Sequence, residues 1–560
     1  MKLLQQGLQG IADGDHFDLV VAGAGGAGLS AALFAALTGA RVLVVERTAH
    51  VGGTTAWSAG TTWVPGTSHA PQVNPQDSLA AAQTYLHNAV GDRAPGALRQ
   101  AFLDHGAEAV AQLESRTEVK YRPYPKHPDY ISDLAGSTLS GRALEPVPFD
   151  GRLLGDLFPL LRPPIPEFTV LGGMMVDRTD INHLLALGRS WPSLKHAVRI
   201  LTRHLMDRLR YPRGTRLVMG NALVGRLLYA LSKHPQVTLT METEITAFST
   251  GPQGVDGVTL LCGGVSRQVR SQRGVVLASG GFNRHPDLRA RLLPGIPMDW
   301  CPAAPGHTGQ LHDLAMGLGA SYPEGGLSPA FWAPVSLRKR PDGSTAVFPH
   351  FVMDRAKPGV LTVNQAGERF VNESTSYHLF GLAMQAAHPV SPAIPAYLVC
   401  DARALRQYGL GMVRPGGKGL SPFLADRYLT EAPTLDALAT QLGMDPAKLA
   451  RSVQQINTAA ATGVDHAFGR GTTAYQQNLG DPTWHGPNPN LGALQEAPFY
   501  AVRLYPGDIG ASTGLQTDAQ ARVLNAEGAP VGGLYAVGND MQSIMGGTYP
   551  APGITIGPGM

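Results

Sequence analysis

The sequence predicts an α/β fold: a Rossmann-like domain that is discontinuous along the chain, with an α+β domain inserted into it. Three observations support this prediction. Apolar runs flank a glycine turn and a small-residue helix between residues 19 and 46. Two later apolar runs, at 270–277 and 531–537, also end in small residues, as strands returning to one sheet do. Between them, 285–500 mixes strands, loops and a helical stretch, which indicates a separate domain.

The first unit reads LVVAGAGGAGLSAALFAALTGARVLVVE over residues 19–46. Gly23 permits a tight turn, Gly25 lets the backbone approach a pyrophosphate, and Gly28 lets the helix lie close to the strand. The helix N-terminus offers unpaired N–H groups and a partial positive charge to that pyrophosphate. Glu46 follows Gly28 by 18 residues, where a carboxylate accepts hydrogen bonds from a ribose. This βαβ unit therefore predicts a bound dinucleotide.

A second glycine-rich loop indicates which dinucleotide it is. Residues 52–60 read GGTTAWSAG and follow Glu46 almost directly. NAD enzymes have no need of such a loop, whereas a flavin ring must lie on backbone close to the sheet. The sequence therefore favours FAD over NAD.

Composition sets the broad class of protein. The chain has 560 residues with 43% hydrophobic and 16% charged residues, typical of a globular enzyme with two or more domains. Its three cysteines are far apart and form no CxxC motif, which favours a reducing, cytoplasmic compartment. The N-terminus does not read as a signal peptide, and no run of about 18 apolar residues predicts a membrane span. The net charge of +3 does not suggest nucleic acid, and we expect no bound metal.

One segment is strongly basic. Residues 189–216 hold eight Lys or Arg residues against the single acid Asp207. Apolar residues recur there at helical spacing, and Lys195, Arg199 and Arg203 form a cationic row alongside. Such a helix is either a peripheral contact with an anionic membrane surface or a solvated helix packed on its own domain.

The rest of the pattern sets the expected order of elements. Helical periodicity is present near 79–118, 180–232 and 434–460, β patterns run over 237–245, 255–261 and 270–277, and 120–175 is irregular. We expect an FAD-binding domain at 1–284 with a basic helical insertion near 178–216. A catalytic domain at 285–500 follows, and 501–560 returns to the FAD-binding domain.

Five segments carry a resemblance to a known family. They are AGAGGAGLSAAL, VGGTTAWSAGTTWVPG, GRALEPVPFDGRLLG, ERFVNESTSYHLFG and GLYAVGNDMQSIMGGTYPAPGITIGP. With them the chain resembles the FAD-dependent 3-ketosteroid dehydrogenases, most closely the Δ1-dehydrogenases, within the flavoproteins that include fumarate reductases. The first two segments are common among flavoproteins, whereas FVNESTSY and GGTYPAPG are more specific.

The resemblance implies a reaction and its residues. A base removes the proton at C2 of a 3-ketosteroid, and hydride leaves C1 for N5 of FAD. Tyr377 is the implied base, and Tyr549 with the backbone N–H of Gly553 would bind the 3-oxygen. Tyr130 fits the supporting tyrosine best, with Tyr124 and Tyr121 as rivals. A phenol has a pKa near 10, so this base needs a neighbour that stabilises its anion.

The resemblance also implies the FAD contacts. Ala24, Gly25, Ala27 and Gly28 would face the pyrophosphate, with Glu46 and Arg47 near the adenosine ribose. The other contacts, around the flavin ring and its pocket, are Gly53, Thr54, Thr55, Ser58, Ala59, Gly60, Ala278, Gly280, Gly538, Asn539 and Ile556. Residues 553–558 read as the start of a helix whose N–H groups face the flavin. Relatives continue into a long helix, so we expect that the chain is either truncated at Met560 or lacks that helix.

Other functions stay open at this point. A Δ4-ketosteroid dehydrogenase differs only in which ring bond is oxidised. A fumarate-reductase-like enzyme would need arginine and histidine clamps for a dicarboxylate, where this chain offers tyrosines. A flavin-binding partner protein docked on a membrane is the non-enzyme alternative, supported only by the basic helix. The electron acceptor, a quinone or a dye-like molecule, is not identified by the sequence.

Overall fold

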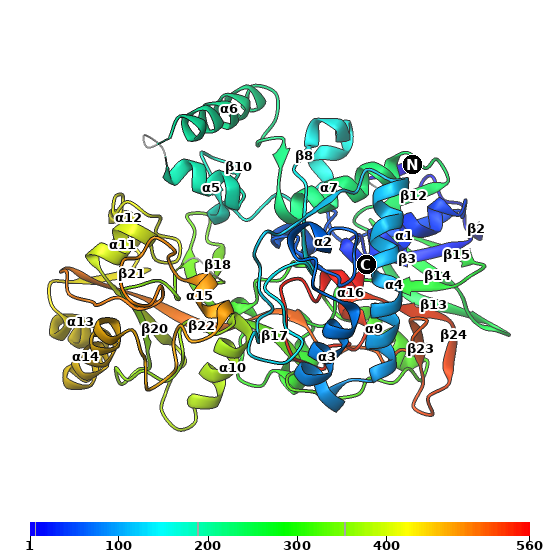
Figure 1. Cartoon of the computed structure of the whole chain (residues 1–560). Helices are drawn as coiled ribbons and strands as arrows, with labels where there is room; N and C mark the ends of the chain where they lie inside the picture. Colours follow the sequence, from blue (N-terminus) through cyan, green and yellow to red (C-terminus); the bar gives the residue numbers. More distant parts are fainter. Residues whose placement is uncertain (6, 187–189, 352–353) are drawn as a thin grey trace.

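The computed structural model describes residues 1–5, 7–186, 190–351 and 354–560. Two lobes lie side by side, and a small helical unit that contains α5 and α6 stands above them (Figure 1). The lobe at the right of the view holds both ends of the chain, and the yellow lobe at the left is built from the middle of the sequence.

The predicted βαβ unit is present. β3 (Leu19–Ala22) leads into α1 (Gly26–Leu37), and β4 (Val42–Val45) lies parallel beside β3. Alanines and glycine line the buried side of α1, which lets this helix lie close to the sheet and to α7 (Met219–Ser232). The two later runs also join this sheet, because β16 (Val275–Leu277) pairs in parallel with β3 and with β24 (Pro530–Ala536).

The main sheet has seven strands in the order β1-β12-β4-β3-β16-β24-β23. Its edge strands are β1 (Lys2–Leu4) and β23 (Arg522–Leu524), and β12 (Val237–Thr240) lies between β1 and β4. One face is covered by α1 and α7, and the other by a four-stranded sheet. That sheet consists of β13 (Glu244–Gly251), β14 (Gly254–Cys262), β15 (Val265–Ser271) and β2 (Asp15–Phe17). The predicted α/β fold with a discontinuous Rossmann-like domain is confirmed.

Two predicted strands are each divided between two sheets. The run 237–245 breaks between β12 and β13, because Glu242 takes a left-handed conformation with φ of 51°. The run 270–277 breaks between β15 and β16 at Gly274, whose φ is 112°. Apolar periodicity continued across both turns, so the sequence pattern concealed them.

The second lobe contains a six-stranded antiparallel sheet. Its strands are β17 (Ala330–Lys339), β18 (Thr345–Pro349), β19 (Val360–Val363), β20 (Ala396–Asp401), β21 (Leu429–Ala432) and β22 (Phe499–Ala511). The helical stretch expected near 434–460 is α13 (Leu435–Leu442) and α14 (Pro446–Thr462). β22 spans the expected domain boundary at residue 500, and the three domain limits stay a prediction.

Between the lobes the chain follows the expected pattern. The helical region near 79–118 is α3 (Leu79–Val90) and α4 (Gly96–Arg116). The irregular region contains two 3₁₀ segments, Gly151–Leu160 and Pro166–Phe168, and short strands. The strands are β6 (Tyr121–Pro123), β7 (Ala143–Pro146), β8 (Phe149–Asp150), β9 (Thr169–Val170) and β10 (Met174–Met175). α5 (Arg178–Leu185) and α6 (Trp191–Arg208) then form the small unit at the top of the view (Figure 1).

The basic segment is only partly a free cationic surface. Arg203 forms an ion pair with Asp150 at 2.7 Å, and Arg216 forms one with Asp180 at 2.7 Å. Arg213 donates to the carbonyl of Leu161 and stacks on Phe158. The predicted cationic row lies on one helix, α6, but Arg203 is paired and joins the unit to the body of the protein. Arg189 lies outside the described residues.

Candidate active site

The glycine turn before α1 leaves no room for side chains at two positions. A Cβ on Gly23, whose φ is +108°, would lie 2.3 Å from the carbonyl oxygen of Ala278, and one on Gly28 would lie 2.0 Å from that of Gly23. A Cβ on Gly25 would meet no atom within 4 Å. Gly25 is also the N-cap of α1, so the N-cap residue itself offers no side-chain acceptor to the first N–H groups of this helix. An anion can therefore approach the exposed end of α1.

The second glycine-rich loop lies against this helix end. The Gly26 N–H donates to Oγ1 of Thr55 at 3.3 Å, and Gly25 forms an isolated parallel bridge with Gly52. Thr54 accepts a hydrogen bond from the Ala304 N–H at 2.9 Å. The rest of the loop is fixed internally: Ser58 accepts the Gly60 N–H at 2.9 Å, and Gly53 and exposed Ala59 complete it.

The acid at the end of β4 also lies at the glycine turn. Glu46 is 7% exposed and accepts hydrogen bonds from the Ala24 N–H at 3.0 Å and from Thr48. Arg47 points elsewhere, since its guanidinium donates to Thr308 and Gln310. Contact of Glu46 and Arg47 with a ribose stays a prediction.

The ends of β16 and β24 complete the candidate dinucleotide site, which we call the cradle. Ala278 follows β16, and Gly538 follows β24 with a Cβ position 3.0 Å from the Cβ of Ala27. A small cavity is lined by Gly538, Asn539, Thr555 and their neighbours, next to Ile556 at the start of α16 (Ile556–Gly559). A helix N-terminus without a side-chain cap, open space at Gly25 and strand ends on both sides fit a bound dinucleotide.

Two residues of this cradle were missed by the sequence analysis. Asp540 is fully buried and accepts hydrogen bonds from the Ser279 hydroxyl, the Gly281 N–H and His312, so it ties the β24 end to the β16 end. His307 lies against Gly280 and Thr54, and burial lowers its pKa to about 4, which keeps it neutral. A carboxylate at a strand end could have revealed Asp540, whereas no local pattern marks His307.

Three of the predicted tyrosines meet at the junction of the lobes. The Tyr130 hydroxyl donates to the Tyr377 hydroxyl at 3.1 Å. The Tyr549 ring lies 5.2 Å from that of Tyr377 and 5.8 Å from that of Tyr130, measured between centroids. All three side chains belong to one buried apolar cluster. Residues far apart in the sequence are thus brought together.

The backbone explains how these rings are placed. Tyr377 is the first residue of α10 (Tyr377–Ala387), whose N-cap Ser376 accepts the Leu379 N–H. Tyr130 is fixed to the other loop, because its N–H donates to the carbonyl of Pro550 at 2.7 Å. The rival phenols lie elsewhere: Tyr124 is within 3.5 Å of Thr61, and Tyr121 donates to the sulfur of Met560.

Gly553 is held in a conformation that suits glycine. Its φ is +89°, and a Cβ would lie 2.2 Å from the carbonyl oxygen of Thr61. Its own carbonyl accepts hydrogen bonds from the N–H groups of Trp63 and Gly557. Within the described ranges, the Gly553 N–H itself meets no protein acceptor. It is therefore available to an oxygen atom of a ligand.

Burial governs the electrostatics of the cluster. Burial, together with the neighbouring phenols, holds the pKa values of Tyr130 and Tyr377 well above 10. Burial also raises the pKa of Tyr549. Next to them, burial lowers the pKa of His378 to about 4. His378 is neutral with Nδ1 accepting the Trp332 N–H, so Nε2 donates to the carbonyl of Gly547. Its tautomer is therefore fixed.

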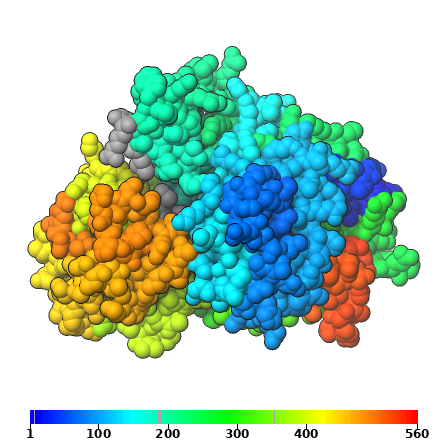
Figure 2. All heavy atoms as spheres, viewed as in Figure 1, coloured from blue at the N-terminus to red at the C-terminus, as the bar shows by residue number. Residues whose placement is uncertain are grey.

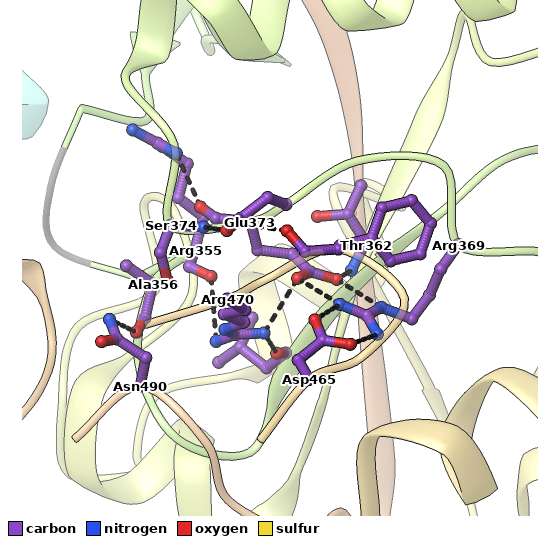
Figure 3. Close-up of polar contacts among 12 residues, drawn as sticks. Arg355, Ala356, Thr362, Arg369, Glu373, Ser374, Asp465, Arg470 and Asn490 are labelled. Carbon is purple, nitrogen blue, oxygen red and sulfur yellow. Dashed lines mark hydrogen bonds and ion pairs between the residues drawn. The ribbon is translucent and has the colours of Figure 1, made fainter. Parts of the chain in front are cut away.

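A buried charge network holds the segment that precedes Tyr377. Figure 3 shows Arg369 between the carboxylates of Glu373 and Asp465, with nitrogen–oxygen distances of 2.9 and 2.8 Å. Arg470 contacts Glu373 from the other side at 3.2 Å. These charges balance, and they fix the turn at 372–376 from which Tyr377 projects.

A cavity of about 230 Å³ lies beside Tyr549. Most of its lining is apolar, including Ile131, Leu134, Leu327 and Leu379, and Arg93 is among its polar residues. An apolar cavity next to a few fixed polar groups is the usual form of a small-molecule site. Tyr475, which the sequence analysis missed, is a fourth phenol here, with its ring 4.7 Å from that of Tyr130.

Fold and site together define a dinucleotide-binding oxidoreductase with a buried phenol cluster. The FAD binding domain family matches residues 18–556. A 4-oxocyclohex-2-ene-1-carboxylate 5-dehydrogenase of Sinomonas cyclohexanicum is 35% identical, over 96% of this chain and 91% of that protein. A 3-oxosteroid 1-dehydrogenase of Mycobacterium tuberculosis is 34% identical, over 97% of this chain and 96% of that protein.

A solved structure agrees with these matches. The crystal structure of 3-ketosteroid Δ1-dehydrogenase from Sterolibacterium denitrificans, in complex with 1,4-androstadiene-3,17-dione, superposes with a TM-score of 0.90. It is 33% identical, covering 98% of this chain and 97% of that one. The chain therefore belongs to the FAD-binding flavoprotein family that includes the 3-oxosteroid 1-dehydrogenases. It is an FAD-dependent oxidoreductase that acts on CH–CH bonds, and the FAD predicted from the sequence is confirmed.

Proposed function

We propose that this protein introduces the 1,2-double bond into 3-ketosteroids. The relatives named above act, by their names, on a cyclic ketone, so a ketone in a ring is the shared feature of the substrates. One observation carries the proposal for this chain: buried Tyr549 and the free Gly553 N–H lie in one loop beside the Tyr130–Tyr377 pair. A donor pair beside a phenol base suits removal of a proton next to a carbonyl.

In this mechanism the ketone oxygen accepts hydrogen bonds from the Tyr549 hydroxyl and the Gly553 N–H. Those donors stabilise the negative charge that develops on the oxygen when the C2 proton leaves. Tyr377 takes that proton, and Tyr130 stabilises the base through the hydrogen bond of 3.1 Å. FAD supplies the acceptor for the hydride that leaves C1. The apolar surroundings exclude water from the reacting carbons.

The N-terminus of α10 helps Tyr377 to ionise. Tyr377 occupies the first helical position, where unpaired N–H groups give a partial positive charge. This charge opposes the burial that raises the pKa of the phenol. The base is therefore supported by one helix end and one phenol.

The alternatives differ in what the site must hold. A fumarate-reductase-like enzyme needs arginine and histidine donors together, but the lining of the cavity beside Tyr549 offers Arg93 without a free histidine, because both ring nitrogens of His378 already have partners. A Δ4-dehydrogenase would use the same phenols on another bond. A smaller ring ketone with a carboxylate is favoured by Arg93, which is exposed and lines the same cavity as Tyr549.

Product analysis tests the proposal. The FAD-loaded protein would be assayed anaerobically with a dye acceptor against 3-ketosteroids and 4-oxocyclohexanecarboxylate, and the new double bond located by mass spectrometry and NMR. A 1,2-double bond in the steroid supports the proposal. A 4,5-double bond, reaction with the cyclohexane acid alone, or no flavin reduction by any ketone would each refute it. The natural electron acceptor is outside this test.

The location of the protein is a separate part of the proposal. The described part of the chain has no helix that is both long and apolar enough to span a bilayer. α6 packs on its unit through Ala197, Ile200 and His204. On another side of the helix, an apolar stripe that includes Trp191, Leu205 and Leu209 is exposed to solvent. Trp191 is 76% exposed, Leu205 66% and Leu209 84%.

This stripe fits an anionic membrane surface. Exposed Lys195, Arg199 and Arg210 lie on or just beyond the same helix, which projects from the body of the molecule (Figure 2). Apolar side chains flanked by cations suit the boundary between lipid headgroups and acyl chains. Peripheral docking through α6, on the cytoplasmic face, is the location we propose.

Vesicle flotation tests the docking. Wild-type protein should float with phosphatidylglycerol vesicles, and a Trp191→Ser, Leu205→Ser, Leu209→Ser variant should not. Replacing exposed Lys126, Lys418 and Arg451 by Glu changes the charge elsewhere and serves as the matched control. Equal flotation of the stripe variant and the wild type, or equal loss in the control, would refute docking through α6.

A further inference from the structure

Arg355 is a fully buried arginine directly beneath the phenol cluster. Its side chain has no exposed surface. Nε donates to the carbonyl of His350 at 3.0 Å, and one terminal nitrogen to that of Phe351 at 3.0 Å. The other donates to the carbonyls of Glu373 and Thr375, each at 2.6 Å. These carbonyls adjoin Tyr377 in sequence or in space.

None of these partners carries a charge. Within the described ranges, no carboxylate oxygen lies within 4.0 Å of the Arg355 guanidinium, although several other buried arginines have such partners. One carboxylate oxygen of the neighbouring Asp354 is hydrogen-bonded to His350 and to the Gly411 N–H, and the other accepts the Arg355 backbone N–H. A guanidinium keeps its proton at neutral pH even when burial lowers its pKa, as it does here.

Two phenols, Tyr475 and Tyr130, act on this charge, and Tyr377 is linked to it through Phe351 and Thr375. The Phe351 ring, whose carbonyl binds Arg355, lies 5.0 Å from the ring of Tyr377. Thr375, which also binds Arg355, is two residues before Tyr377. The Tyr475 hydroxyl is buried without a hydrogen-bond partner in the described part of the chain, and its ring lies tilted against that of Tyr130, with 4.7 Å between the centroids. Burial raises the pKa of Tyr475 to about 12, and the positive charge of Arg355 acts in the opposite direction by lowering this pKa.

We propose that Arg355 is the buried positive charge that stabilises the ionised base of this site. The proposal rests on the function proposed above, and it makes Arg355 a positioning residue, since it acts through Tyr377 and does not touch the substrate. A cation within the same low-dielectric region favours the anionic form of a nearby phenol. Such a cation would lower the pKa of Tyr377 and so allow a buried tyrosine to act as a base.

The other charges around this site do not supply that cation. Glu373 is compensated by Arg369 and Arg470, and Asp465 by Arg369 (Figure 3). Asp354 binds His350 at 2.6 Å and is a negative charge close to Arg355, and His378 is neutral. Tyr130, Tyr475 and Tyr549 are the remaining titratable groups facing Tyr377 and Arg355.

The test compares Arg355→Gln with Arg355→Lys in the full-length, FAD-loaded protein. The rate of anaerobic flavin reduction by a 3-ketosteroid is measured against pH. Loss of the charge should raise the apparent pKa of the base by about one unit or more, which makes reduction about tenfold slower at every pH below that pKa. Arg355→Lys keeps the charge, so its profile should stay close to that of the wild type at low pH.

Arg226→Gln is the matched structural control. Arg226 is also buried and also donates to backbone carbonyls, those of Glu118, Val147 and Pro148, but it lies on α7 in the other lobe. Its loss should lower thermal stability without moving the pH profile. An Arg355→Gln variant that is less stable yet keeps the apparent pKa of the wild type would overturn the proposal.

If Arg355→Gln does not fold, Arg355→Lys decides alone. A buried lysine loses its proton at lower pH than arginine, so its rate should fall behind the wild type as pH rises. A profile parallel to the wild type over the whole range would contradict a role for the charge. Ultraviolet titration of tyrosinate in the same variants works even if no ketone reduces the flavin, so failure of the proposed function is distinguishable from failure of this inference.

Discussion

Replacement of Tyr377 by phenylalanine is the most direct perturbation of the proposed site. The phenol sits at the first turn of α10, 6% exposed, and accepts the Tyr130 hydroxyl at 3.1 Å. Loss of a positioned base typically costs a factor of about 10²–10⁴ in rate, or roughly 3–5 kcal/mol in the barrier. The Tyr130 hydroxyl also loses its acceptor, which costs about 1–3 kcal/mol of folding free energy. The variant should therefore be folded, yellow and nearly inactive.

Stopped-flow absorbance of the flavin under anaerobic conditions measures this directly. Tyr428→Phe is the control, because Tyr428 is equally buried and its hydroxyl binds Ser336 and the Met412 N–H at 2.8 Å each, in a different apolar cluster from that of Tyr377. It should lose stability but keep its rate of flavin reduction. A Tyr377→Phe protein that carries full FAD and reduces within tenfold of the wild-type rate would refute the assignment of the base.

Further predictions concern pH, the cofactor and stability. Because burial raises the pKa of Tyr377, flavin reduction should become faster as pH rises from about 6 to 10; a flat profile would contradict a phenol base. The same shift predicts lower stability above about pH 10, where unfolded phenols ionise before the buried ones, and thermal unfolding at pH 9 and 11 checks it. Gly25→Ala should fold normally, because its Cβ meets no protein atom, but it should bind FAD weakly, because that Cβ occupies the open space at the end of α1. Gly28→Ala should also unfold at lower temperature, because its Cβ would meet the carbonyl of Gly23; FAD content and Tm separate the two. Glu373→Gln should cost about 3–5 kcal/mol by leaving buried Arg470 without its carboxylate partner, and a change of Tm like that of a surface variant would refute this.

Local patterns were sufficient for the Rossmann-like part of the fold. Gly28 is required by the carbonyl of Gly23, which is local, and Gly23 by the carbonyl of Ala278 at the end of β16, which is distant in the sequence. The spacing of these glycines nevertheless identifies the motif. The breaks at Glu242 and Gly274 were not visible, because apolar residues continue on both sides while the strands enter different sheets. The domain limits and site roles stay predictions.

The phenol cluster shows where sequence reasoning stops. Tyr130, Tyr377 and Tyr549 were identified through resemblance, and only the folded chain shows that their rings lie within 6 Å of one another. Tyr475 and Arg355 carry no local signal, because their importance lies in what they face across the fold. The stripe on α6 is the converse case: its helical spacing was visible, but the spacing could not tell which side of the helix is buried.

The site presents one physical problem that links these observations. Burial that excludes water from an enolate also makes a phenol hard to ionise, and here it raises the pKa values of Tyr377 and its neighbours together. A base in such a place works only if positive charge is fixed nearby before the substrate arrives. In our proposal the end of α10 supplies part of it and Arg355 supplies more, while Glu373 and Asp465 are paired with Arg369 and Arg470. If the Arg355 charge proved irrelevant to the titration of the base, the helix end and the Tyr130 hydrogen bond would have to provide the whole effect.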